Sequence, residues 1–269
     1  HLFDLPALQD NSRWLLIEVL IKTPIKDFPQ LCSSNKEISQ LCSGKLTNEQ
    51  KLLYGDQITE SLYKQRSKKY FGEEILDLKE EMSWKEFYER VVKLYNNNKT
   101  LDKRLADKYA KEGKLFELKL LASIPPPKGP ILPDKYTVNY VAEKGYINIL
   151  EWIKENGLEL PNQTGANWAT TYGSLNSLKW MKDNNLSPPD QDGVNYAAYN
   201  GHLHVLKWLK ENKLILPDQN GANWAAEVGK INILEWIKKN KLLFPDQKAI
   251  NEAEKNGYTK VVEWMRNNS

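Results

Sequence analysis

The chain has 269 residues, 41% of them hydrophobic, which is enough to bury a large core and excludes a wholly disordered protein. Its 38 basic and 35 acidic residues nearly balance, so we expect no nucleic-acid partner. No apolar run is long enough to span a bilayer, so we expect no membrane association and a cytoplasmic location, with entry to the nucleus by diffusion.

Residues 1–98 show no long repeat and are predicted to form a small helical domain. One apolar helix face is formed by Leu15, Leu16, Val19 and Leu20. This helix is expected to end at Thr23, because the residue before Pro24 disfavours helical geometry. Two more short helices are predicted from the apolar residues Ile25, Phe28, Leu31, Ile38 and Leu41. Two cysteines, Cys32 and Cys42, are too few for a disulfide framework, so we expect two buried thiols in a reducing compartment.

The stretch Leu16-Ile17-Glu18-Val19-Leu20, followed by Pro24, Asp27-Phe28 and then Leu31 to Lys36, resembles an F-box. It departs from that family where Asn11-Ser12 replaces the opening Leu-Pro and where the closing tryptophan is missing after Cys42. The resemblance implies docking on the Skp-type adaptor of cullin ubiquitin ligases. The residues implied in this contact are Leu16, Val19, Leu20, Pro24, Ile25 and Phe28. The alternative is a helical cap for the repeats that follow.

The rest of this domain carries two further patterns. A basic cluster of Lys64, Arg66, Lys68 and Lys69 is predicted to lie on a solvated helix face rather than to bind phosphate. Ser83, with Glu86 three residues later, is predicted to begin a helix with a capping box.

Residues 99–130 are predicted to hold a degenerate first repeat and a proline-rich connector. Ala110-Lys111-Glu112-Gly113 and the apolar residues after it match the pattern around Gly145. The stretch Pro125-Pro126-Pro127 supplies a stiff connector.

Residues 131–269 contain five units with a period of 28 residues. The tryptophans at this interval are Trp152, Trp180, Trp208, Trp236 and Trp264. The same interval separates Gly145, Gly173, Gly201, Gly229 and Gly257; Pro133, Pro161, Pro189, Pro217 and Pro245; and Asn139, Asn167, Asn195, Asn223 and Asn251. Each unit is predicted to form a short helix ending at the glycine, a second amphipathic helix around the tryptophan, and a connector. Asn156, Asn184, Asn212 and Asn240 are expected to end the second helix in left-handed geometry.

The stretch from Asp192 to Leu209, which begins Asp192-Gly193 and contains Ala197-Ala198 and Asn-Gly-His-Leu, resembles the ankyrin repeat. The ankyrin period of about 33 residues is shortened here, as in ankyrin-like arrays encoded by giant DNA viruses of amoebae, and β-hairpin fingers are not expected. The predicted fold is all-α, a helical-repeat solenoid of shortened ankyrin-like units behind a small helical F-box-like domain.

No catalytic motif was recognised, and we expect no enzyme activity, cofactor or metal. The chain has only 3 histidines, and His202 and His204 point in different directions on a helix. The asparagine ladder is predicted to form buried hydrogen bonds between units, because a polar group at a stacked position needs a partner.

A target-binding face is predicted where residues vary at equivalent positions of the units. We place it beside the glycines, at Glu143, Tyr146, Thr171, Tyr172, Tyr199, His202, Glu227, Lys230 and Tyr258. Tyrosine is common among the residues that dominate binding energy. The function expected is therefore that of a substrate receptor for a cullin-type ligase. The alternative is a structural or scaffolding protein, such as a virion component, and neutral drift would also explain the variable positions.

Overall fold

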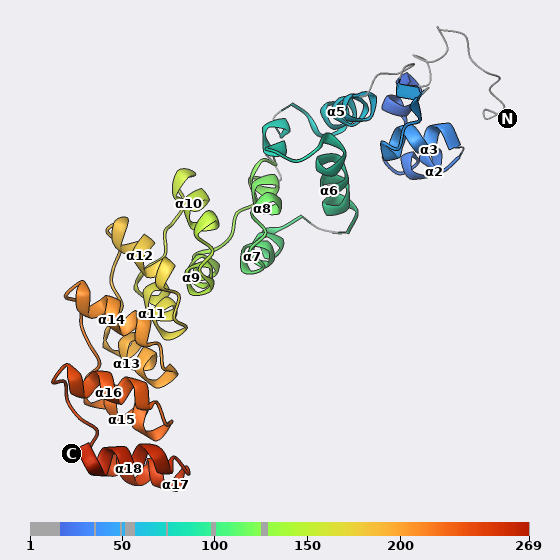
Figure 1. The fold of residues 1–269 in the computed structure, drawn as a ribbon. Helices are drawn as coiled ribbons and strands as arrows, with labels where there is room; N and C mark the ends of the chain where they lie inside the picture. Colours follow the sequence, from blue (N-terminus) through green and yellow to red (C-terminus); the bar gives the residue numbers. More distant parts are fainter. Residues whose placement is uncertain are drawn as a thin grey trace. The chain divides into compact units, whose positions relative to one another are not determined.

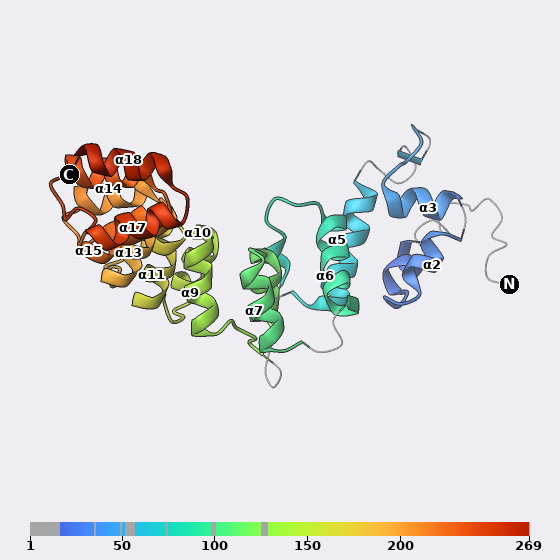
Figure 2. The same ribbon diagram turned by 90° about the horizontal axis from the view of Figure 1, so that it is seen from below.

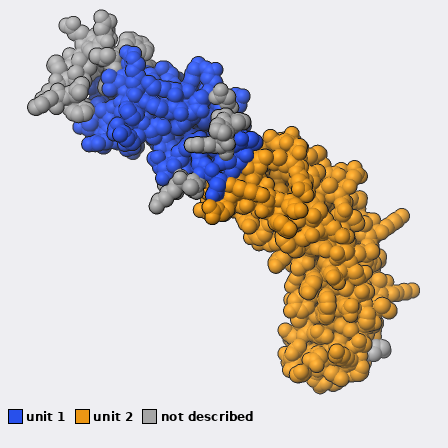
Figure 3. Space-filling model, turned by 180° about the vertical axis from the view of Figure 1, so that it is seen from behind, with its two compact units in different colours: residues 1–102, 119–131 blue, residues 103–118, 132–269 orange. Residues whose placement is uncertain are grey.

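The computed structural model describes residues 17–34, 36–48, 50–51, 57–73, 75–97, 101–124 and 129–268. These residues form helices and connections, and no strand occurs among them. The chain divides into two compact units (Figure 3), residues 1–102 with 119–131 and residues 103–118 with 132–269. The predicted all-α helical-repeat fold is confirmed.

The first unit contains short helices whose apolar faces share one core. Residues 17–22 are helical and stop before Pro24, as predicted. They are followed by α2 (Phe28–Cys32), α3 (Lys36–Ser43), α5 (Ile58–Phe71), η1 (Leu76–Lys79) and α6 (Trp84–Asn97). The core of this unit contains Ile17, Leu20, Phe28, Ile38, Leu41, Cys42, Ile58, Leu62, Tyr63 and Tyr88. Ser83 caps α6, since its hydroxyl accepts from the Glu86 N–H at 3.1 Å.

Arg66 contradicts the prediction of a solvated basic face, because its side chain is 0% exposed. Its guanidinium donates to the carbonyl oxygens of Leu20 and, at 3.0 Å, Thr23, where the first helix ends. It also donates to the Tyr88 hydroxyl at 2.6 Å and lies 3.5 Å from the centroid of the Phe28 ring. The unpaired carbonyls at a helix C-terminus attract a cation, so Arg66 joins the first helix to α5 and α6.

The end of α3 is held by the same two helices. Thr59 donates to the Leu41 carbonyl at 2.9 Å, and the Tyr63 hydroxyl donates to the Cys42 carbonyl at 3.0 Å. Lys85 of α6 donates to the Ser43 carbonyl at 3.3 Å. The side chains of α5 and α6 therefore satisfy the carbonyls that α3 leaves without helical partners.

The prediction of two free thiols is wrong, because Cys32 and Cys42 form a disulfide between α2 and α3. Their Cα atoms lie 5.8 Å apart, within the usual range for a disulfide. The connection between the two short helices brings the sulfurs together, which a count of cysteines could not reveal. The count therefore carries no information about the redox compartment.

The second unit is a stack of helix pairs. Its inner helices are α7 (Lys103–Lys111), α9 (Lys135–Lys144), α11 (Gln163–Thr171), α13 (Gln191–Asn200), α15 (Gln219–Glu227) and α17 (Gln247–Lys255). The outer helices are α10 (Ile147–Glu155), α12 (Leu175–Asp183), α14 (Leu203–Glu211), α16 (Ile231–Lys239) and α18 (Thr259–Asn268). The helix after α7, α8 (Leu115–Ala122), begins in this unit and ends in the first, to which residues 119–131 belong. Figures 1 and 2 show the pairs stacked in chain order from α9–α10 to α17–α18.

The asparagine ladder joins consecutive units, as predicted. Asn195 Oδ1 accepts from the Asp218 backbone N–H at 3.2 Å, and Asn195 Nδ2 donates to the Asp218 carboxylate at 2.9 Å. The same carboxylate caps α15 by accepting from the Asn220 N–H at 2.8 Å. The pairs Asn167–Asp190 and Asn223–Asp246 repeat both hydrogen bonds. In the first repeat the role falls to Asp107, which accepts from the Asp134 N–H at 2.8 Å.

The core of the array lies between its two layers of helices. The paired alanines of the inner helices, such as Ala197 and Ala198, are 0% exposed. Trp152, Trp180 and Trp236 are buried, whereas Trp208 and Trp264 are half-buried against the same core. Small residues thus let the inner helices approach closely, and the tryptophans fill the space between the outer ones.

The asparagines that end the outer helices act differently from the prediction. Asn212 has φ −91°, so it is not left-handed, and its Nδ2 donates to the Trp208 carbonyl four residues earlier at 2.8 Å. The left-handed residue is the next one: Gly157, Asn185, Lys213 or Lys241, with φ of 63°, 56°, 56° and 55°. The side-chain amide is therefore a second donor to a carbonyl that already accepts from the Asn212 backbone N–H at 3.0 Å, and the chain reverses at the residue after it.

Candidate protein-interaction surface

One ladder of aromatic residues was not among the predicted site residues. Tyr140, Trp168, Tyr196 and Trp224 recur at the repeat interval on α9, α11, α13 and α15, and Glu252 takes the place in the last unit. Each follows the ladder asparagine directly, and all four are exposed or half-buried. The sequence signal was the spacing itself, which does not tell a core aromatic from a surface one.

Three more tyrosines widen this surface. Tyr136, Tyr172 and Tyr199 are 66%, 61% and 40% exposed. The Tyr196 ring lies 6.4 Å from that of Tyr199 and 5.2 Å from that of Trp224 in the next unit. We call the combined set the aromatic face: Tyr136, Tyr140, Trp168, Tyr172, Tyr196, Tyr199 and Trp224. Exposed aromatic area on a repeat array is the kind of surface that proteins use to bind partners.

The aromatic face contains a hollow where α9, α11 and α13 meet. Its volume is 480 Å³, and it is lined by Glu143, Asn167, Trp168, Thr171, Tyr172, Asp192, Gly193 and Tyr196. Three predicted target-binding residues, Glu143, Thr171 and Tyr172, are brought together here. Glu143 is 9% exposed, and its carboxylate lies 2.9 Å from the Lys144 ammonium.

The other ladder of variable residues has a structural task. Tyr146, His202, Lys230 and Tyr258 each cover the left-handed glycine of the preceding unit, as Ser174 does less closely. A Cβ added to Gly173, for example, would lie 2.7 Å from the His202 ring. These side chains pack between units, and all but Tyr258 are half-buried. These positions therefore also serve the packing of one unit on the next, and their contact with a target stays a prediction.

The last predicted residue, Glu227, lies at the end of α15 and is half-buried. Its backbone carbonyl accepts from Asn256 Nδ2 at 3.1 Å, which ties α15 to the end of α17. Asn200 makes the equivalent contact two units earlier, with the Thr171 carbonyl at 2.9 Å.

Some of the predicted adaptor-binding residues are buried in the core of the first unit, and others lie at its surface. Leu20 and Phe28 are 0% and 4% exposed, so they hold the first unit together and offer no surface to an adaptor. Val19 is 45% exposed, Pro24 is exposed, and Ile25 is half-buried. Leu16 lies outside the described residues. The helical spacing identified one apolar stripe but could not show how deeply each residue is covered.

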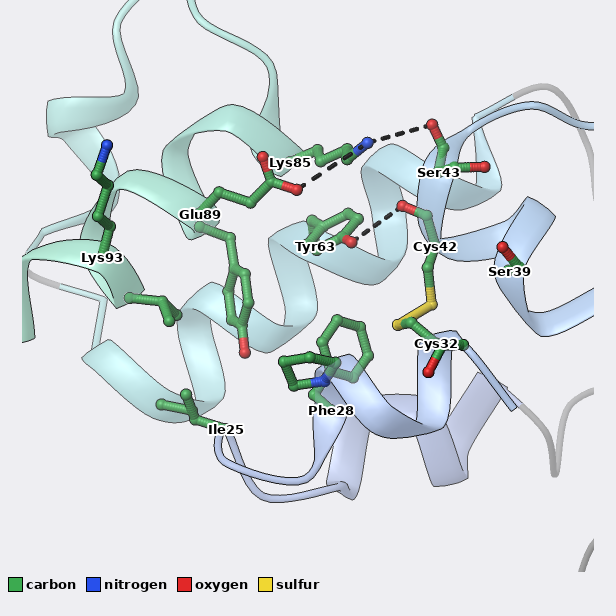
Figure 4. Close-up of a pocket in the computed structure, with 14 residues that line it drawn as sticks. Ile25, Phe28, Cys32, Ser39, Cys42, Ser43, Tyr63, Lys85, Glu89 and Lys93 are labelled. Carbon is green, nitrogen blue, oxygen red and sulfur yellow. Dashed lines mark hydrogen bonds and ion pairs between the residues drawn. A yellow bond between two sulfur atoms is a disulfide. The ribbon is translucent and has the colours of Figure 1, made fainter. Parts of the chain in front are cut away.

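Ile25 lies at a hollow of 430 Å³ in the first unit (Figure 4), together with Pro29, Val92 and the Cys32–Cys42 disulfide. Figure 4 shows the Tyr63 hydroxyl directed at the Cys42 carbonyl and Lys85 between Ser43 and Glu89. Burial raises the pKa of Tyr63 and of Tyr88, so both phenols remain protonated. The Tyr63 hydroxyl donates to the Cys42 carbonyl, whereas the Tyr88 hydroxyl accepts from Arg66. The polar groups here serve the fold, and the apolar rim is what remains for a partner.

In the described part of the chain, no group of three or more His, Cys, Asp or Glu side chains is placed to hold a metal ion. None of the described helices is long and apolar enough to cross a membrane. A scan against models of protein families finds no match to this chain, and a search of curated proteins finds none either.

Proposed function

We propose that this chain is a protein-interaction module in which a shortened ankyrin-like array holds a partner protein. The observation that carries the proposal is the aromatic face, which extends over four inner helices with tyrosines as much as 66% exposed. Aromatic area with polar tips is typical of the residues that dominate binding energy in protein interfaces.

We infer further that the first unit docks on a Skp-type adaptor of a cullin ubiquitin ligase, which would make the chain a substrate receptor. The support is the F-box-like stretch, together with the apolar positions it leaves at the surface, Val19, Pro24 and Ile25. The hollow beside Ile25 would receive an apolar side chain of the adaptor. Leu20 and Phe28 would support this surface from beneath.

The test is capture of a purified Skp-type adaptor by the full chain. Val19→Asp and Ile25→Asp should each abolish capture, because a carboxylate in an apolar contact loses its hydration without gaining a partner. Tyr136→Asp on the array is the matched control and should capture normally. If the wild-type chain captures no adaptor, or if the two variants capture as well as wild type, the adaptor proposal fails and the array proposal stands alone.

A further inference from the structure

The lining of the hollow between α9, α11 and α13 combines two kinds of group that attract cations. Trp168, Tyr172 and Tyr196 contribute aromatic rings, whose faces carry partial negative charge. Glu143 and Asp192 contribute carboxylates. Among the described residues that line this hollow, none is basic.

A lysine of the chain itself already uses these groups. The Lys144 ammonium lies 2.9 Å from the Glu143 carboxylate and 5.8 Å from the centroid of the Tyr172 ring. It also lies 4.8 Å from the centroid of the Tyr140 ring. The edge of the hollow therefore holds an ammonium between a carboxylate and two aromatic faces, which is the arrangement that a cationic ligand would need.

We propose that this hollow binds a cationic side chain, a lysine or arginine, of the partner protein. The inference rests on the proposed function and specifies the chemistry of the target. A carboxylate from the partner would be repelled by Glu143 and Asp192. A purely apolar side chain would strip water from these carboxylates and give them no partner, which costs free energy. A cation satisfies both the carboxylates and the rings.

The order of affinities also follows from the position of Lys144. Because its ammonium pairs with the Glu143 carboxylate and lies over the Tyr172 ring, it competes with an incoming cation for the same groups. Lys144→Met should therefore strengthen binding of a cationic ligand. Asp192→Asn and Tyr172→Leu should weaken it, since one removes a charge and the other removes an aromatic face while keeping apolar area.

The experiment is a nuclear magnetic resonance titration of the full chain, observed at the indole N–H of Trp168 and assigned by its loss in Trp168→Phe. The probe is the capped peptide Gly-Ser-Lys-Ser-Gly, compared with the same peptide carrying norleucine in place of lysine. We expect a saturable shift with the lysine peptide and binding about 10-fold weaker with norleucine. Asp192→Asn and Tyr172→Leu should each weaken binding of the lysine peptide by about 3-fold to 10-fold. Tyr95→Leu on α6 is the matched control, because Tyr95 is 45% exposed and lies outside the aromatic face, and it should leave binding unchanged.

Three results would overturn the inference: no shift of Trp168 with the lysine peptide, equal binding of the two peptides, or equal weakening by Tyr95→Leu and Tyr172→Leu. The titration contains no adaptor, so failure of adaptor capture leaves its result untouched. If a partner protein binds the aromatic face while the lysine peptide does not, the interaction function holds and the cation specificity is wrong.

Discussion

Arg66 gives the sharpest test of how the first unit is held together. Replacing it by Met removes charge-assisted hydrogen bonds to Leu20, Thr23 and Tyr88. Each such bond contributes about 1.5–3 kcal/mol, and the loss is offset by the several kcal/mol that burying the cation costs. The balance is a destabilisation of about 2–4 kcal/mol. Arg66→Lys should be no better than Arg66→Met, because an ammonium keeps the burial cost and cannot reach three acceptors in forked geometry.

Native-state hydrogen exchange read by mass spectrometry is the suitable assay, since a chain with two units does not unfold in one step. A loss of about 3 kcal/mol should speed exchange of the slowest amides in α5 and α6 by roughly 100-fold and leave those of α11 to α15 unchanged. Lys68→Met is the control on the same helix, because the Lys68 side chain is 62% exposed. Unchanged exchange in Arg66→Met, or rescue by Arg66→Lys, would refute the role assigned to the guanidinium.

Three further predictions concern the array. Asn195→Ala should destabilise the array by about 2–3 kcal/mol in urea unfolding, because the partly buried Asp218 N–H loses its acceptor. Asn251→Ala is the control and should change the free energy of unfolding by less than about 0.5 kcal/mol, because the Asn251 side chain is exposed. Lys213→Gly should stabilise the array by about 0.5–1 kcal/mol and Gly157→Lys should destabilise it, because both positions are left-handed and only glycine adopts this geometry without strain. Effects of the same sign in the two variants would contradict this prediction. Burial lowers the pKa of His202, and the charges of His204 and Lys230 add to the effect. Its contribution to stability is therefore complete above the ordinary pKa of 6.5 and is lost as pH falls through the lower folded value. His202→Asn should reduce the decrease in melting temperature between about pH 7.5 and pH 5. If the decrease is the same in the variant and the wild type, groups other than His202 cause it.

The repeat period and the helix pairs could be predicted because they depend on local, repeated chemistry. A glycine that closes a helix and an asparagine that bridges to the next unit recur in one register, so the sequence displays them directly. The partners of the asparagines could also be anticipated, since a buried amide at a stacked position must bond across the stack. The first repeat was harder to recognise, because Asp107 replaces the ladder asparagine there and accepts from the Asp134 N–H.

The features that escaped prediction depend on contacts between distant residues. Arg66 is buried because the carbonyls at the end of the first helix lie against it, 43 residues away from Thr23 in sequence. A basic run on a helix carries no sign of such a partner. The packing of His202 could not be predicted for a related reason, since its ring lies against Gly173 of the preceding unit, 29 residues earlier in the sequence.

A comparison of the last unit with the others shows whether the aromatic residues of the inner helices are needed for these helices to stack. Glu252 occupies this register on α17, yet Asn223 still bridges to Asp246 and the Asp246 carboxylate still caps α17. Since inner helices stack with a carboxylate at this position, the rings of Tyr196 and Trp224 are not needed to join one unit to the next. Exposed aromatic side chains also reduce solubility, so folding alone gives no reason to place them there. These are therefore the positions at which we propose that a partner protein makes contact.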